Sequence, residues 1–79
     1  MNYRILYFAS LRDAAGSDAE EMQSAQSDAR ALYAELQQRH GFTLQPERLR
    51  LAVNGEFAPW DRVLADGDEI AFLPPVSGG

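Results

Sequence analysis

The 79-residue sequence contains no cysteine and no lysine, and it has a single histidine. The missing thiols exclude disulfide bonds, thiolate metal ligands and a cysteine nucleophile, and the missing lysines exclude Schiff-base chemistry on a side chain. The sequence also lacks an apolar run of membrane-spanning length and the basic start of a secretory signal. We therefore expect a cytoplasmic protein with no bound metal and no bound cofactor.

Positive charge is scarce, because 12 acidic residues oppose seven arginines and the formal net charge is −5. Nucleic-acid binding requires a basic face, which this composition does not supply. An acidic surface instead attracts basic protein partners over long distances. The length allows a single domain with a small core. The sequence thus predicts one domain that binds proteins, and neither nucleic acid nor membrane.

Hydrophobic patterning predicts an α+β domain in which four to five strands form a mixed sheet on one main helix. Strands are expected at residues 3–9, 19–25, 49–53, 56–58 and 69–73. The helix is expected to follow an N-cap at Ser27 or Asp28 and to end at His40, with Gly41 as the residue that terminates it. Between these elements, Asn54-Gly55 is a strong signal for a type I′ hairpin turn.

Other segments carry weaker signals. Residues 10–18 are rich in alanine and polar residues, so we expect a loop with at most one helical turn. In the strand at 19–25 only Met22 is a large apolar residue, which is typical of a short edge strand. Trp60 and Val63-Leu64 are expected to cover one end of the core.

The sequence contains few residues that could together form a catalytic site. His40 is interpreted as a helix-end residue with no acid placed to work with it. The carboxylates at Glu20-Glu21 and at 66–69 are interpreted as solvated charges at turns and strand ends, and they lack the spacing of a calcium loop. No glycine-rich phosphate loop follows a strand. We therefore expect that the domain is not a catalyst by itself.

One helix covers only one face of a sheet, so apolar residues that alternate onto the other face stay exposed. Leu6, Phe8, Phe57 and Leu73 fall on that second face in the predicted strands. Contiguous apolar patches on small domains mark partner-binding sites. We expect these four residues to form such a patch near the point where the C-terminal segment leaves the domain, although singly exposed apolar residues are an ordinary alternative.

The C-terminal segment predicts chemistry of its own. Pro74-Pro75 stiffen the end of the last strand, and Val76-Ser77-Gly78-Gly79 follow. We divide the chain into a folded domain, 1–74, and a flexible tail, 75–79, which spans roughly 16–18 Å when extended. A C-terminal carboxylate becomes a good acyl donor once ATP adenylates it, and a sulfur nucleophile then converts it to a thiocarboxylate. Glycine suits a narrow active-site channel, whereas a frayed terminus is the ordinary alternative.

Three stretches, 64–79, 5–12 and 51–55, resemble the small subunit of molybdopterin synthase, the MoaD family, and the resemblance extends over the whole chain. The most specific is the ending Asp-Gly-Asp-Glu-Ile-Ala-Phe-Leu-Pro-Pro-Val-Ser-Gly-Gly. The region 17–28 departs most from the family pattern, because it is unusually polar. The resemblance implies a ubiquitin-like β-grasp fold with a flexible Gly-Gly tail.

The same resemblance implies a sulfur carrier for molybdenum cofactor biosynthesis. Gly79 would be adenylated by a ubiquitin-activating-like enzyme that consumes ATP, then converted to 1-thioglycine. Pro75, Val76, Ser77 and Gly78 would insert into the large synthase subunit, where sulfur passes to cyclic pyranopterin monophosphate. The complex would be a heterotetramer. By position, the residues that match the large-subunit contacts of the family are Phe8, Phe57 and Leu73.

Three alternatives stay open at this point. A carrier for thiamine thiazole synthesis or tRNA thiolation would share the fold and the activation chemistry. A plain β-grasp interaction module would carry an inert tail. A protein modifier would be found joined through Gly79 to lysines of its targets.

Overall fold

The computed structural model describes residues 1–75 of the chain. Its elements are β1 (Asn2–Tyr7), α1 (Ala9–Ala15), β2 (Ala19–Gln23), α2 (Ala29–His40), a 3-10 turn (Pro46–Arg48), β3 (Arg50–Val53), β4 (Glu56–Ala58) and β5 (Glu69–Leu73). The five strands form one sheet in the order β2-β1-β5-β3-β4. β1 and β5 run parallel, and the other neighbours run antiparallel. The predicted α+β class and mixed sheet are confirmed.

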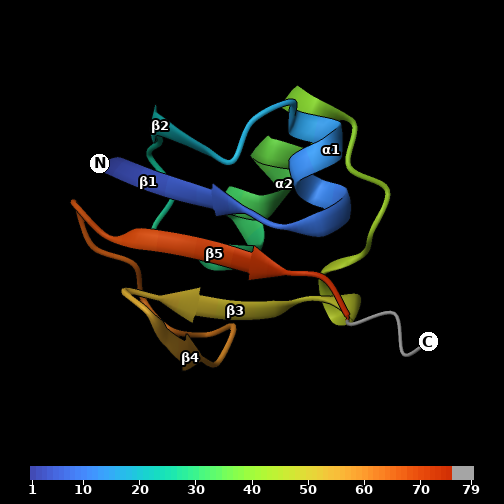
Figure 1. Cartoon of the computed structure of the whole chain (residues 1–79). Helices are drawn as coiled ribbons and strands as arrows, with labels where there is room; N and C mark the ends of the chain where they lie inside the picture. Colours follow the sequence, from blue (N-terminus) through green and yellow to red (C-terminus); the bar gives the residue numbers. More distant parts are fainter. Residues whose placement is uncertain (76–79) are drawn as a thin grey trace.

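Helix α2 lies against one face of the sheet, behind the strands in Figure 1. The carboxylate of Asp28 caps it by accepting a hydrogen bond from the backbone N–H of Arg30 at 3.3 Å. Gly41 ends it with a φ of 73°, which the absence of a Cβ makes easy. The sequence-based bounds of this helix are confirmed.

Helix α1 corrects the sequence-based expectation of a loop at 10–18. It covers seven residues, of which only Leu11 is buried, so it has no apolar stripe for periodicity to detect. Ala9 takes a positive φ of 52° and turns the chain out of β1, which is why that strand ends at Tyr7 and not at residue 9. Gly16 closes the helix by donating its backbone N–H to the carbonyl oxygen of Arg12 at 2.9 Å.

The weakly predicted segments fold largely as expected. β2 is an edge strand whose one buried residue is Met22, and it ends at Gln23, two residues before the predicted end. Asn54 and Gly55 both have positive φ values, 54° and 84°, as the predicted type I′ turn between β3 and β4 requires. Of the residues expected over one end of the core, Leu64 is buried, but Val63 is 73% exposed and that part of the prediction is wrong.

The core lies between the sheet and α2. Tyr33 of α2 is its aromatic centre, with ring centroids 5.1 Å from Phe72 and 6.0 Å from Phe42. The Tyr33 hydroxyl keeps a hydrogen bond by donating to the carbonyl oxygen of Leu44 at 2.8 Å. The buried cluster consists of Tyr3, Ile5, Tyr7, Leu11, Met22, Ala29, Leu32, Tyr33, Leu36, Phe42, Leu49, Leu51, Val53, Leu64, Ile70 and Phe72.

Candidate functional site

The face of the sheet opposite α2, which we call the open face, carries a row of side chains set by strand register. Leu6 of β1 pairs with Ala71 of β5, Ala71 pairs with Ala52 of β3, and Ala52 pairs with Phe57 of β4. Two methyl-sized side chains therefore lie in the middle of the row, between Leu6 and Phe57. A row that is large at its ends and small in its centre is concave.

That concavity is a hollow of about 190 Å³, which we call the apolar hollow. Its lining consists of Leu6, Phe8, Ala52, Gly55, Phe57, Glu69, Ala71 and Leu73. The four residues predicted to form an apolar patch all line it. Phe8 is 43% exposed and Phe57 is 63% exposed, so large apolar surface remains in contact with solvent there. The arrangement suits an apolar side chain from another molecule, and contact of Phe8, Phe57 and Leu73 with a partner stays a prediction.

The C-terminal segment leaves the domain at the edge of this hollow. Leu73 is both the last residue of β5 and part of the lining, Pro74 is half-buried and Pro75 is exposed. α1 and the end of β5 lie at the same end of the sheet (Figure 1). The predicted roles of Val76, Ser77, Gly78 and Gly79 concern residues outside those described, and the division into 1–74 and 75–79 stays a prediction.

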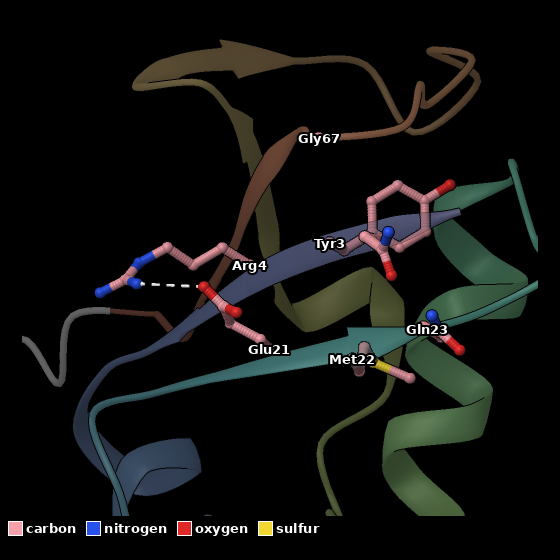
Figure 2. A pocket seen from close by; sticks show the side chains of 7 residues that line it. Tyr3, Arg4, Glu21, Met22, Gln23 and Gly67 are labelled. Atoms are coloured by element: carbon pink, nitrogen blue, oxygen red, sulfur yellow. Dashed lines mark ion pairs between the residues drawn. The ribbon is translucent and has the colours of Figure 1, made fainter.

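The opposite end of the open face carries the charged side chains of Arg4 and Glu21. A hollow of about 270 Å³ lies there, and its lining consists of Asn2, Tyr3, Arg4, Glu21, Met22, Gln23 and Gly67. Figure 2 shows Arg4 of β1 and Glu21 of β2 reaching toward one another, with nitrogen and oxygen 3.6 Å apart. The Arg4 guanidinium also lies 3.7 Å from the carboxylate of Glu69, which borders the apolar hollow. Side chains of this end already interact with one another, so it has less apolar surface to offer.

Sequence reasoning missed a polar cluster on the covered face. Register places Glu20 opposite Ile5, on the side of α2. Its carboxylate accepts a hydrogen bond from the hydroxyl of Tyr7, and it lies 2.6 Å from Nε2 of His40 and 3.1 Å from the guanidinium of Arg39. The expectation that Glu20 is a solvated charge is therefore wrong, as is the expectation that no acid faces His40. Strand alternation from Met22 was the one signal that could have found it.

The contacts of this cluster explain its pKa shifts. Burial, together with the hydrogen bond to the anionic carboxylate, raises the pKa of Tyr7 well above its ordinary range. Burial alone would raise the pKa of Glu20, but hydrogen bonds from Tyr7 and His40 and the charge of Arg39 outweigh it and lower that pKa. Since both carboxylate oxygens are occupied, the cluster ties β2 to the end of α2 and serves structure.

Two further findings concern residues 1–75. In that part of the chain no group of three or more histidine, aspartate or glutamate side chains is arranged to hold a metal ion. Neither helix there has the length and apolar character needed to cross a membrane.

Comparison with known proteins identifies close relatives. A family model described as the ThiS family matches residues 5–79. The molybdopterin synthase sulfur carrier subunit of Escherichia coli (strain K12) is 38% identical over 79 residues, which covers 96% of this chain and 98% of the relative.

Solved structures agree with the sequence comparison. A putative molybdopterin converting factor subunit 1 from Pyrococcus furiosus superposes with a TM-score of 0.77 at 31% identity and covers 96% of this chain and 99% of its own. Subunit 1 of the molybdopterin-converting factor of Helicobacter pylori was solved in complex with subunit 2. It superposes with a TM-score of 0.69 at 26% identity, and the match covers all of this chain and all of that subunit. Small archaeal modifier protein 1 of Haloferax volcanii superposes with a TM-score of 0.72 at 30% identity. The match covers 95% of this chain and 98% of that protein. The expected ubiquitin-like β-grasp fold is confirmed.

Proposed function

The chain belongs to the ThiS family and is 38% identical to a molybdopterin synthase sulfur carrier subunit, and from this we propose that it is the sulfur-carrying small subunit of a molybdopterin synthase. The observation that carries the proposal is the apolar hollow with the root of the C-terminal segment at its edge. A carrier of this kind needs a face that docks on a partner and a chain end that the docking directs into the partner.

The chemistry resides in the carboxylate of Gly79. This carboxylate attacks the α-phosphate of ATP on a ubiquitin-activating-like enzyme, and pyrophosphate leaves. A sulfide-level nucleophile then attacks the acyl carbon through its sulfur, the bond from that carbon to the phosphate oxygen breaks and AMP leaves, and loss of the remaining proton gives a C-terminal thiocarboxylate. Because the activating step consumes ATP, we place this function in the cytoplasm. The carrier itself supplies no general acid or base to these steps.

The loaded carrier then docks on the large synthase subunit. Phe8, Phe57 and Leu73 bury their exposed surface against that subunit, and an apolar side chain of the subunit fills the hollow. Residues 75–79 enter the active site, where sulfur passes to cyclic pyranopterin monophosphate. The complex of subunits 1 and 2 from H. pylori supports such a pairing, and we propose a heterotetramer of two small and two large subunits.

Mass spectrometry of the intact chain tests the proposal. After incubation with ATP, a sulfur donor and the molybdopterin-pathway activating enzyme, we expect a mass gain equal to the replacement of one oxygen by sulfur, localised to Gly79. The variant Gly79→Ala should fold normally and load poorly, because the added methyl group narrows the fit to the channel. An unchanged mass, with an enzyme that loads its own carrier in parallel, would contradict the proposal. Normal loading of Gly79→Ala would contradict the steric argument alone.

A second candidate function is covalent modification of proteins. The 30% identity to small archaeal modifier protein 1 favours it, since that protein shares the fold and nearly the full length. Both functions begin with adenylation, so the mass gain does not separate them. Tryptic peptides whose lysines are joined to Gly79 would support modification, whereas formation of dithiolene product with the large subunit would support the synthase. Loading followed by binding to a thiazole synthase or a tRNA-thiolating enzyme would indicate one of the other carriers.

A further inference from the structure

Among the residues that the structure describes, Arg50 differs from most arginines in having no carboxylate within ion-pair distance. Within residues 1–75, the arginines that form ion pairs are Arg4, Arg12, Arg30 and Arg39. The arginines that form none there are Arg48, Arg50 and Arg62. Of the latter three, Arg50 is the one with a cation–π contact to a residue that lines the apolar hollow, because its guanidinium lies 4.2 Å from the ring centroid of Phe57.

Strand register fixes where this positive charge lies. Arg50 is the first residue of β3 and pairs with Leu73 at the end of β5, so it lies beside the root of the C-terminal segment. The cation–π contact holds the guanidinium over Phe57, and no ion pair joins it to a carboxylate within residues 1–75. On the other border of the hollow, the carboxylate of Glu69 lies 3.7 Å from the guanidinium of Arg4, which also pairs with Glu21. Among the described residues, the border on the β1 side is therefore net acidic, whereas the border on the β3–β4 side carries the positive charge of Arg50.

A second concave region lies beyond Phe57 on that side. It measures about 400 Å³, and its lining consists of Leu49, Arg50, Leu51, Phe57, Ala58, Pro59 and Trp60. Phe57 thus forms a ridge between two hollows, and Arg50 faces the second. A partner surface that straddles this ridge places one side chain in the apolar hollow and another beside the guanidinium.

We propose that the large synthase subunit presents a carboxylate to Arg50 when it docks on the open face. A guanidinium binds a carboxylate through two parallel hydrogen bonds, which fixes orientation as well as charge. The net charge of −5 attracts basic groups over the rest of the surface, whereas a basic group placed at Arg50 is repelled. Arg50 is therefore a specificity-determining residue for docking, placed opposite Leu73 at the end of β5. This inference rests on the proposed function.

Binding to the purified large subunit, measured at low and high salt, tests the inference. Arg50→Gln should raise Kd about tenfold at low salt and reduce the salt dependence of association. Arg50→Lys should fall between Arg50→Gln and wild type, since it keeps the charge and loses the planar contact. Arg62→Gln is the matched control, because it changes the net charge equally at an exposed position outside the hollow, and it should stay within about twofold of wild type. Thermal unfolding of each variant verifies the fold.

The possible outcomes separate this inference from the proposed function. If Arg50→Gln binds like Arg62→Gln while Phe57→Ala binds weakly, the open face docks but no carboxylate meets Arg50, and the inference is wrong. Tighter binding by Arg50→Gln would also overturn it, and would indicate that Arg50 holds the chain's own terminal carboxylate. If the wild-type chain fails to bind a large subunit that binds its own carrier, both the proposed function and this inference are wrong.

Discussion

The two faces of the sheet are built from neighbouring residues of the same strands, yet one face is buried and the other is partly exposed to solvent. In β5, Ile70 and Phe72 are fully buried against α2, while Leu73 on the open face is half-exposed. On the covered face large side chains fill the space under the helix. On the open face, alanines at 52 and 71 leave the centre of an equally apolar row unfilled. An apolar surface without a covering element of its own is suited to one supplied by another molecule.

The largest expected effect comes from the covered face. Phe72→Ala should lower the free energy of unfolding by about 3–5 kcal/mol, because it removes a fully buried ring that contacts Tyr33 and Trp60. Leu73→Ala, one residue further on the open face, should cost less than about 1 kcal/mol. Urea unfolding monitored by circular dichroism gives both values. Similar costs for the two variants would mean that the faces do not differ as described.

A charge on the open face should affect binding and spare the fold. Phe8→Asp should weaken binding to the large subunit by about 2–4 kcal/mol, because docking would desolvate a carboxylate at the border of the hollow. Its thermal midpoint should stay close to that of wild type, since Phe8 is 43% exposed. Titration calorimetry measures the binding. A collapse of the thermal transition would instead place Phe8 in the core.

Filling the hollow from within is a subtler test of the same face. Ala71→Leu adds volume at the centre of the row and should weaken partner binding by about 1–3 kcal/mol, since the space for the partner's side chain is lost. Ala34→Leu, at an exposed position of α2, makes the same change outside the hollow and should leave binding unaffected. Unchanged binding of Ala71→Leu would mean that the partner does not enter the hollow.

From the sequence pattern, the covered face of the sheet could be predicted better than the polar contacts could. Alternation in β1 and β5 and the apolar stripe of α2 are local signals, so these elements and the four apolar residues of the patch could be predicted, whereas the hollow between those residues was not. Helix α1 buries only Leu11 in seven residues and gave no such signal. The Glu20 cluster unites residues from β1, β2 and α2, and it forms only when the fold brings those elements together. Contacts of that kind have no local pattern.

The smallest expected effect contrasts two adjacent carboxylates on opposite faces. Glu20 is enclosed by Tyr7, His40 and Arg39, whereas the Glu21 side chain is 80% exposed. Glu20→Gln should cost about 1–2 kcal/mol of stability at neutral pH, because the amide makes weaker hydrogen bonds than the charged carboxylate. Glu21→Gln should cost less than about 0.5 kcal/mol there. Equal costs would show that strand alternation does not separate the environments of these two residues.

The pH dependence of this difference follows from the direction of the Glu20 pKa shift. The pKa of Glu20 in the folded chain lies below its ordinary value of 4.5, so the unfolded chain binds the proton more readily. Its carboxylate therefore contributes stability that is complete above that ordinary value and is lost as the pH falls through the folded pKa. The gap between wild type and Glu20→Gln should be widest near neutrality and close in acid. Urea unfolding over a pH series measures the gap, and a gap that persists unchanged in acid would mean that shape, and not charge, makes Glu20 stabilising.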